Sequence, residues 1–373
     1  MSGRTLCIAF IIDVFAPNAE SGFGGSVYLS GLVSRLTGLG VECRIVTRSG
    51  SVQPSVSGQV IPIGRVPYTK TGYVSKLRFS HDLWNSRSLF DGVDLVHSLS
   101  AASIPFLHYL HRSGVPTVFD CRTAFLRTSR RLAMFQAVAL AFCPPSRVLF
   151  CDAISAVEYR RFMRRGALLL PVPVECSAAS EAAPIRPRLE RILFATQLSE
   201  EKGLPDLLEA MALLRRRGVC VSLHVAGDGP LRPLVERIAA RHDGRLVYHG
   251  LLSQPAVAAL LPQMDLLVHP SYWESVSRSV LEAMGQGLPV VTTDVGGMQI
   301  LARHGLIASI PPRNGRALAD AVEQLGSDYD RRQELCERGR RYVLERHGWQ
   351  HVFPPLCRLY RELGVRVPDS SVA

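Results

Sequence analysis

The chain has 373 residues, of which 47% are apolar and 20% are charged, so it can bury the cores of two domains and is not a disordered or low-complexity chain. Its formal net charge of +11 is uneven, because residues 1–174 contain 19 Lys and Arg against 9 Asp and Glu, whereas residues 175–373 contain 24 against 23. A basic chain can bind nucleic acid, but the sequence lacks zinc-finger spacing, an RNP motif and a heptad-bearing basic region, so nucleic acid is a weaker option and we expect no such partner.

The cysteines and the apolar runs indicate a compartment. None of the nine cysteines forms a C-x-x-C or a Cys/His cluster, so we expect reduced core thiols in a cytoplasmic protein and no metal site. The apolar N-terminal run contains Asp13, which suits a strand rather than a secretory signal. The longest later apolar run, residues 132–143, contains Gln136 and is too short to span a bilayer.

The first predicted elements are a buried strand over residues 6–12, a glycine-rich turn ending at Gly24 and Gly25, and an amphipathic helix that Gly40 terminates. A strand over 41–47 follows. The dinucleotide pattern G-x-G-x-x-G fails here, because Val27 replaces its last glycine and the second strand ends in Arg48 instead of an acid. We therefore interpret Gly24 and Gly25 as backbone that lets a ligand approach closely. The alternative is a plain strand-to-helix turn.

Two further strand ends in the first half carry polar residues. His97 follows the predicted strand 93–96, and Asp120 and Arg122 follow the predicted strand 115–119. Ligands bind at the carboxyl ends of strands in open α/β sheets, so Asp120 and Arg122 are candidates for a ligand site. For His97 the alternative is an ordinary turn residue.

Basic residues are clustered in the rest of the first half. Arg127, Arg130 and Arg131 share one predicted helical face, and a second group contains Arg160, Arg161, Arg164 and Arg165. Apolar and aromatic residues, among them Met134 and Phe135, are interleaved with them. This combination suits the surface of an anionic membrane, and the alternative is a solvated Arg-rich face.

A stretch rich in Ala, Ser and Pro, residues 172–190, predicts a linker between two domains. After it, a predicted strand over 191–196 is followed by Gln197, by Lys202 and by a helix over 204–214. A strand over 221–225 then runs into a turn containing Gly227 and Gly229. Apolar runs that alternate with helical patterns predict parallel sheets buried on both faces. If no ligand binds here, Lys202 is a solvated side chain beside two acids, and Gly227 and Gly229 form a tight turn.

The most informative segment is residues 266–297, which predicts a strand, a loop, a helix and a second strand. Glu274 lies in the loop, and Glu282 lies in the early turns of the helix, with Ser277 as its expected N-cap. The free N–H groups at a helix N-terminus favour a phosphate, and carboxylates accept hydrogen bonds from sugar hydroxyls. A ligand with both groups fits this pattern. The alternative is an ordinary βαβ unit.

Residues 270–297 read PSYWESVSRSVLEAMGQGLPVVTTDVGG, which resembles the E-x(7)-E signature of the family-4 retaining glycosyltransferases, usually PSxxEGFGxxxLEAMAxGxPVVxxxxGG. Two other segments are similar to family elements. ATQLSEEKG resembles GRLxxEKG, and the turn with Gly227 and Gly229 resembles xxGxGP. The chain departs from the pattern at Gln197, where the family has an Arg. The resemblance extends over nearly the whole sequence.

The resemblance implies an α/β fold of GT-B architecture, with two Rossmann-like doubly wound parallel-sheet domains facing a central cleft. Residues 1–176 would bind the acceptor and residues 188–348 a nucleotide-diphospho sugar, while a C-terminal helix over 349–364 crosses back to the first domain. It implies catalytic roles for Glu274 and Lys202. Donor-binding candidates are Gln197, Gly227, Gly229, Ser275, Val276, Ser277, Arg278 and Glu282. Candidates in the cleft of the first domain are Gly24, Gly25, His97, Asp120 and Arg122.

The implied function is transfer of a sugar from that donor to a hydroxyl acceptor with retention of configuration, in the synthesis of cell-envelope glycan, exopolysaccharide or glycolipid. No cofactor or metal is required, because Lys202, Arg278 and the helix N–H groups carry the charge of the leaving diphosphate. The acceptor is expected to be lipid-linked or anionic, and the protein to lie in the cytoplasm or against the inner face of the membrane. Two alternatives stay open: a catalytically weakened relative that binds nucleotide sugars, and a nucleotide-sugar epimerase of similar fold.

Overall fold

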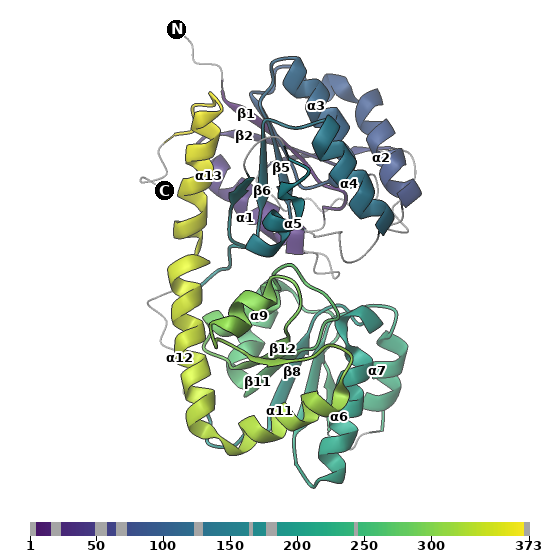
Figure 1. Cartoon of the computed structure of the whole chain (residues 1–373), viewed down its shortest axis with the longest axis vertical. Helices are drawn as coiled ribbons and strands as arrows, with labels where there is room; N and C mark the ends of the chain where they lie inside the picture. The colour runs from purple at the N-terminus through teal and green to yellow at the C-terminus, as the bar shows by residue number, and fades with distance from the viewer. Residues whose placement is uncertain are drawn as a thin grey trace. The chain divides into compact units, whose positions relative to one another are not determined.

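The computed structural model describes residues 5–15, 24–48, 58–64, 73–122, 130–163, 167–176, 185–241 and 245–368. The chain divides into two compact units (Figure 1). Unit 1 consists of Met1–Asn18, Phe23–Pro171 and Gln350–Ala373, and unit 2 consists of Ala19–Gly22 and Val172–Trp349. The C-terminal segment of the sequence therefore belongs to the same unit as the N-terminal half.

Among the described residues, unit 1 contains a seven-stranded parallel sheet with the strand order β3-β2-β1-β4-β5-β6-β7. Its strands are β1 (Cys7–Ile11), β2 (Glu42–Arg48), β3 (Gln59–Ile63), β4 (Leu95–Ser98), β5 (Thr117–Cys121), β6 (Arg147–Phe150) and β7 (Ala167–Leu169). Its helices are α1 (Gly24–Gly38), α2 (Tyr73–Asn85), α3 (Ile104–Arg112), α4 (Arg130–Phe142), α5 (Ala153–Arg160) and α13 (Trp349–Glu362), with 3-10 turns η1 (Arg87–Phe90) and η2 (Ala101–Ser103).

The sequence of unit 1 explains these elements. Every residue of β1, CIAFI, is buried, as expected for a parallel strand covered on both faces. Helix α1 buries Leu29, Leu32, Val33 and Leu36, whose spacing of three and four residues places them on one face. The short central strands thus form a mainly apolar layer.

Unit 2 contains, in the part of the chain that is described, a six-stranded parallel sheet with the order β10-β9-β8-β11-β12-β13. Its strands are β8 (Arg191–Ala195), β9 (Ser222–Ala226), β10 (Leu246–Tyr248), β11 (Leu266–His269), β12 (Val290–Thr293) and β13 (Ala308–Ile310). Its helices are α6 (Leu204–Arg216), α7 (Arg232–Ala239), α8 (Gln254–Leu260), α9 (Arg278–Gly285), α10 (Met298–Arg303), α11 (Gly315–Ser327) and α12 (Tyr329–Arg346), with 3-10 turns η4 (Glu200–Lys202) and η5 (Leu261–Gln263).

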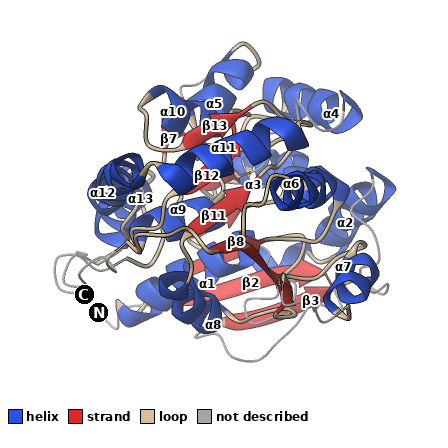
Figure 2. Cartoon of the chain, turned by 90° about the horizontal axis from the view of Figure 1, so that it is seen from below, coloured by secondary structure: helices blue, strands red, loops and turns tan. Residues whose placement is uncertain are grey.

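Helices cover both faces of the sheet in unit 2, as Figure 2 shows. Helix α6 packs against α11, and α9 packs against α12. Helix α6 buries Leu204, Leu207, Ala210 and Leu214 along one face, as the spacing of its leucines predicts. The unit is thus a three-layer α/β sandwich with its core on either side of the sheet.

Each sheet has one topological switch point, where the strand order reverses. In unit 1 it lies between β1 and β4, and in unit 2 it lies between β8 and β11. In open parallel sheets, ligands bind outside the carboxyl ends of the strands at this point. The two switch points are therefore the places where sites are expected.

The described part of the chain contains no helix long and apolar enough to cross a membrane. All nine cysteines are free thiols, and six of them are buried.

Candidate functional site

At the switch point of unit 2, three side chains from separate elements meet. The Oε1 atom of Glu274, in the loop between β11 and α9, accepts a hydrogen bond from His269 Nε2 at 2.9 Å and another from Lys202 Nζ. His269 is the last residue of β11, and Lys202 ends the turn η4 that follows β8. The structure therefore brings together the two predicted catalytic residues, with His269 as a third partner.

The charge of Glu274 is determined by these neighbours. Burial by itself would raise the pKa of its carboxyl group, but the Lys202 ammonium and the His269 imidazole outweigh burial and lower the pKa to about 2. Glu274 is consequently ionised at any physiological pH. A largely but not fully buried, ionised acceptor of hydrogen bonds suits a ligand that presents hydroxyl groups.

Two glycines hold the backbone of the Glu274 loop. A Cβ atom at Gly296 would overlap the carbonyl oxygen of Glu274, and a Cβ atom at Gly297 would overlap that of Ser275. Gly296 also has a φ of +50°, in the left-handed region that L side chains seldom adopt. The loop with Glu274 is thus seated on the Gly296–Gly297 pair at the end of β12, which explains these glycines without a direct ligand contact.

Glu282 has a different environment from Glu274. It lies on α9, and its Oε1 atom accepts a hydrogen bond from Nε of Arg278 at 2.6 Å, one turn earlier in the helix. Burial raises the pKa of Glu282, and the Arg278 guanidinium offsets only part of this increase. Arg278 Nη1 is buried without a hydrogen-bond partner among the described residues. Arg278 is therefore an ion-pair partner of Glu282 that retains a donor.

The N-terminus of α9 leaves its backbone donors available. Ser277 is the N-cap residue, as predicted, but its side chain makes no capping hydrogen bond, and its Oγ lies 3.0 Å from Ser279 Oγ. Ser275 and Ser277 are buried, and Val276 is half-buried between them. A helix N-terminus without a side-chain cap is suited to an anionic group.

The glycine turn after β9 packs on the segment after β8. A Cβ atom at Gly227 would overlap the carbonyl oxygen of Thr196, and one at Gly229 would lie 2.5 Å from the carbonyl oxygen of Leu198. The backbone N–H of Leu198 donates to the Asp228 carbonyl at 2.9 Å. The two turns thus support each other on either side of Gln197, whose side chain is exposed. These contacts explain both glycines through packing, and a donor-binding role for them stays a prediction.

In unit 1, the predicted cleft residues form a buried network. The carboxylate of Asp120 accepts two hydrogen bonds from Arg122, from Nε and Nη2, each at 2.9 Å, and lies 3.4 Å from His97 Nε2. His97 Nδ1 lies 2.6 Å from the hydroxyl of Tyr360 on α13. Burial alone would raise the pKa of Asp120, but Arg122 and His97 lower it to about 2.

The positions of His97 and Asp120 correct the sequence analysis. Both are expected just after a strand, but His97 lies within β4 and Asp120 lies within β5, and both side chains are fully buried. The reason is that each strand continues past the apolar run that identifies it, because polar groups that pair with each other can occupy a core. Asp120 and His97 connect β4, β5 and α13, while Arg122 also stacks on the ring of Tyr28 at 3.7 Å.

Other predicted residues are placed only in part. Gly24 and Gly25 are the first residues of α1, and a Cβ atom at Gly24 would meet nothing within 4 Å. Arg127, Arg164 and Arg165 lie outside the described residues, as do the side chains of Arg130 and Arg131. The same helix, α4, exposes an apolar stripe of Met134, Val138 and Phe142, which are 66%, 50% and 73% accessible to solvent.

Sequence reasoning did not identify His269 as part of the site. The sequence does contain a signal, because a His that ends an apolar strand at a switch point lies where ligands bind. Asp328 and Asp330 have the spacing of an Asp-x-Asp metal motif. However, Asp328 is the N-cap residue of α12, and its side chain accepts a hydrogen bond from the N–H of Arg331 at 2.9 Å. Within the described ranges, no group of three or more His, Cys, Asp or Glu residues could hold a metal ion.

Comparison with known proteins connects this geometry to a family. Residues 190–328 match the family described as Glycosyl transferases group 1. Alpha-D-kanosaminyltransferase of Streptomyces kanamyceticus is 30% identical over 177 residues, which are 47% of this chain and 46% of that protein, so the chain spans about half the length of this relative. D-inositol 3-phosphate glycosyltransferase of Arthrobacter sp. (strain FB24) is 26% identical over 392 residues, covering 90% of this chain and 89% of that one.

A solved structure agrees over both units. Sucrose-phosphate synthase from Thermosynechococcus elongatus matches with a TM-score of 0.80 at 19% identity, and the match covers 96% of this chain and 99% of that one. The predicted α/β architecture, with two Rossmann-like parallel-sheet domains, is confirmed. The protein thus has the GT-B glycosyltransferase fold, and its second unit matches the group 1 glycosyltransferases over residues 190–328.

Proposed function

We propose that this protein is a glycosyltransferase that moves a sugar from a nucleotide-diphospho sugar to a hydroxyl acceptor with retention of anomeric configuration. The observation that carries the proposal is the Lys202–Glu274–His269 cluster at the switch point of unit 2, in a segment that matches the group 1 family. This cluster combines a cation for a diphosphate with an ionised carboxylate for sugar hydroxyls. We assign the product to cell-envelope glycan, exopolysaccharide or glycolipid.

The leaving diphosphate is stabilised by groups of the chain itself. Lys202 supplies one cation, the N–H groups at the start of α9 supply aligned dipoles, and the buried Nη1 of Arg278 supplies a further donor. These groups act on charge that develops as the glycosidic bond breaks, so they lower the barrier rather than only binding the donor. In this proposal the reaction requires no metal ion and no cofactor.

Glu274 orients the sugar and does not attack it. Its carboxylate already accepts hydrogen bonds from Lys202 and His269, and a pKa of about 2 makes it a weak base. The departing phosphate oxygen can take the acceptor proton on the same face of the sugar, which gives retention without a protein nucleophile. Glu282, held by Arg278, is assigned to the ribose of the nucleotide.

Features of unit 1 support a proposal for the acceptor and the location. The exposed stripe of Met134, Val138 and Phe142 on α4 belongs to the half of the sequence that carries nearly all of the net charge. Apolar side chains that insert, together with basic residues nearby, suit an anionic membrane surface. We assign the protein to the cytoplasmic side, against the inner face of the membrane, and its acceptor to lipid-linked or anionic molecules.

Two alternatives have distinct signatures. Gln197 in place of the family Arg favours a relative that binds nucleotide sugars without turnover, since the diphosphate then lacks one bidentate cation. An epimerase of similar fold would convert the donor with no acceptor present. The release of nucleoside diphosphate, measured with and without acceptors, separates both alternatives from the transferase.

The test begins with a thermal-shift screen of nucleoside diphosphates and nucleotide sugars on the full chain. Calorimetry then compares variants with the best ligand. We expect Lys202→Ala to weaken nucleoside diphosphate binding about 10- to 100-fold, the scale of one charge-assisted hydrogen bond. Glu274→Gln should preserve that affinity within about 3-fold and abolish sugar transfer, because in this proposal Glu274 contacts the sugar and not the diphosphate, and glutamine still accepts a hydrogen bond from Lys202.

Arg217→Ala is the matched control, because Arg217 is a cation of unit 2 in an ion pair with Asp320 and Glu323 on the surface. It should bind and turn over like wild type. The proposal is wrong if no nucleotide or nucleotide sugar stabilises the protein, or if Lys202→Ala and Glu274→Gln both behave like Arg217→Ala.

A further inference from the structure

The switch point of unit 1 carries a cluster of charged residues that the donor site does not use. Asp13 lies just after β1, Arg48 is the last residue of β2, and Ser100 lies just after β4. The switch point lies between β1 and β4, so these residues border the place where an open parallel sheet binds ligands. The Lys202 cluster occupies the corresponding place in unit 2.

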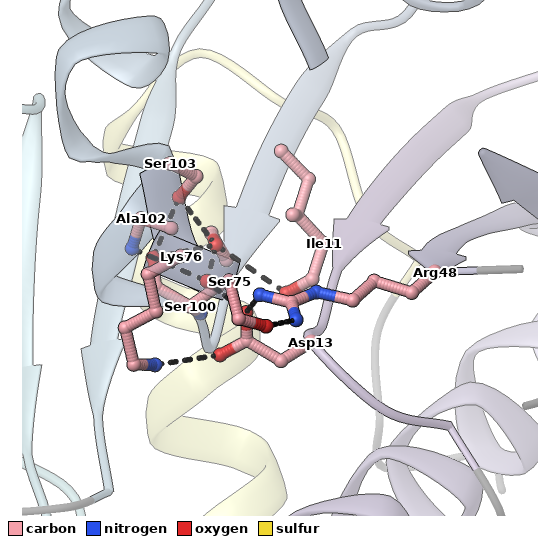
Figure 3. Close-up of polar contacts among 9 residues, drawn as sticks. Ile11, Asp13, Arg48, Ser75, Lys76, Ser100, Ala102 and Ser103 are labelled. Atoms are coloured by element: carbon pink, nitrogen blue, oxygen red, sulfur yellow. Dashed lines mark hydrogen bonds and ion pairs between the residues drawn. The ribbon is translucent and has the colours of Figure 1, made fainter. Parts of the chain in front are cut away.

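One carboxylate organises this cluster, as Figure 3 shows. Asp13 Oδ1 accepts a hydrogen bond from Ser100 Oγ at 3.0 Å and one from Arg48 Nη2 at 3.2 Å, while Oδ2 accepts from Lys76 Nζ at 3.0 Å. The side chains of Arg48 and Lys76 are only 9% and 12% accessible, whereas that of Asp13 is 25% accessible. Asp13 thus holds two largely buried cations from different elements beside each other.

A serine ladder beneath the cluster makes it rigid. Ser103 Oγ donates to Ser98 Oγ at 2.7 Å, and Ser98 Oγ accepts from the Ser100 backbone N–H at 3.0 Å. Ser100 Oγ in turn accepts from the N–H of Ala102 at 3.2 Å. All three serines are fully buried. Such a network fixes the Ser100 hydroxyl toward Asp13, and functional sites require this support from surrounding residues.

The start of α1 adds a positive dipole at the same place. A Cβ atom at Gly25 would lie 3.8 Å from Ile12 Cδ1 and 4.0 Å from Leu99 Cδ2, and Ser26 Oγ donates to the Val14 carbonyl at 3.0 Å. The N-terminus of α1 therefore lies beside the ends of β1 and β4. Its first turn contains no acidic residue, so the dipole acts together with the two cations.

We infer that this Asp13 cluster is the acceptor subsite of unit 1, and that it takes a hydroxylated molecule carrying a phosphate or carboxylate group. The inference rests on the proposed function for the identity of the molecule as the acceptor. Arg48, Lys76 and the start of α1 donate to the oxyanion, and the more accessible Asp13 carboxylate accepts from a neighbouring hydroxyl. Arg48 and Lys76 are thus specificity residues that select an anionic sugar or polyol over a neutral one.

The test is calorimetry on the full chain with a saturating nucleoside diphosphate in the cell, so that the donor site is occupied. A hexose phosphate, the corresponding hexuronic acid and the neutral parent hexose are titrated. We expect at least one anionic probe to bind about 10-fold or more tightly than the neutral hexose. The phosphate and carboxylate arms show which oxyanion is preferred.

Lys76→Gln is the diagnostic variant, because Arg48 also packs over the ring of Phe79 at 4.9 Å and its loss would disturb the core. Lys76→Gln should weaken the binding of the anionic probe about 10-fold and leave the affinity for the neutral hexose unchanged. Arg78→Gln removes the same charge from the same helix at an exposed position and should change neither. Arg48→Lys retains the charge and should give an intermediate loss.

Thermal melting and nucleoside diphosphate affinity of each variant show that it is folded. The inference is overturned if the three probes bind equally, if Lys76→Gln matches Arg78→Gln, or if the nucleoside diphosphate displaces the anionic probe. A protein that binds the donor but not the anionic probes refutes this subsite alone. A protein that binds the probes but no nucleotide refutes the proposed function instead.

Discussion

Glu274 and Glu282 show how two carboxylates eight residues apart acquire opposite acidities. Lys202 and His269 lower the pKa of Glu274 to about 2, whereas burial raises the pKa of Glu282 and Arg278 offsets only part of the increase. Environments that separate two pKa values in this way assign different roles to otherwise equal groups. Glu274 is permanently ionised, and Glu282 is the carboxylate that takes a proton first as the pH falls.

This difference predicts the pH dependence of donor binding. A carboxyl group with a raised pKa is ionised above that value and loses its charge as the pH falls through it. The affinity for a nucleotide sugar, whose diphosphate is esterified at both ends, should therefore decrease as the pH falls from neutral through the raised pKa of Glu282, and Glu274 should not contribute. Calorimetry across this range should show a flat profile for Glu282→Gln. Glu274→Gln should keep the wild-type slope, and a flat profile there would refute the assignment.

At the scale of elements, the loop between β11 and α9 depends on a turn far along the sequence. Gly296 and Gly297, after β12, leave room for the carbonyl groups of Glu274 and Ser275. The glycine pair thus acts on the chemistry through the backbone of a neighbouring loop.

Arg332 also connects segments that are distant in the sequence. Its side chain is fully buried and donates to the carbonyl groups of Leu325, Gly326, Arg186 and Pro187.

Gly296→Ala should therefore damage the site and the fold together. A methyl group there must displace the carbonyl of Glu274 and sits at a φ of +50°, so we expect a loss of about 2 kcal/mol or more in the free energy of unfolding. For a domain of this size, that loss lowers the Tm by roughly 4–8 °C. Differential scanning calorimetry and a sugar-transfer assay should show both effects.

The control is Gly326→Ala, near the end of α11, where a Cβ atom would meet nothing within 4 Å. Its Tm should stay within about 2 °C of wild type or rise slightly, since alanine favours a helix. If Gly296→Ala and Gly326→Ala had equal Tm and equal activity, the seating of the Glu274 loop on this glycine would be refuted.

At the scale of the whole molecule, the two halves of the sequence differ in charge. Residues 1–174 contain 19 basic and 9 acidic residues, whereas the family match and the Lys202 cluster lie in the second half. The first half also exposes the apolar stripe on α4. In the proposed function, this division corresponds to donor chemistry in unit 2 and to acceptor or membrane contact in unit 1.

The membrane assignment predicts that the protein co-sediments with anionic vesicles and not with neutral ones. Each Arg near such a surface contributes about 1 kcal/mol, so the triple Arg127, Arg130 and Arg131→Gln variant should lose most of the binding. High salt should weaken the association, because exposed charges are screened. Replacing both Met134 and Phe142 with Ser should reduce binding at every salt concentration, since insertion of apolar side chains is not screened.

Val247→Ser is the control, because Val247 is an exposed apolar residue on β10 of unit 2 that is 37% accessible. It should bind vesicles like wild type. Equal and negligible binding to both vesicle types would remove the membrane from the proposal. A loss of nucleotide affinity in the triple variant would show that the arginines support the fold instead.

The sequence by itself determined the order of the elements and the local positions of the main candidates. Strand β11, helix α9 and strand β12 could be predicted because apolar runs and terminating glycines act within a few residues. For the same reason Glu274 was placed in a loop and Glu282 on a helix. These features depend on local periodicity and backbone conformation, which a short segment already contains.

Only the tertiary structure decided which side chains meet. Glu274 and Lys202 are 72 residues apart, and His97 and Tyr360 are 263 apart. Asp13 and Lys76 are 63 residues apart in the sequence, and no local sequence pattern identifies either residue as part of a site. Such pairs depend on the order of strands in a sheet and on the packing of helices over it. They arise only when the whole chain is folded, because no short segment contains both partners.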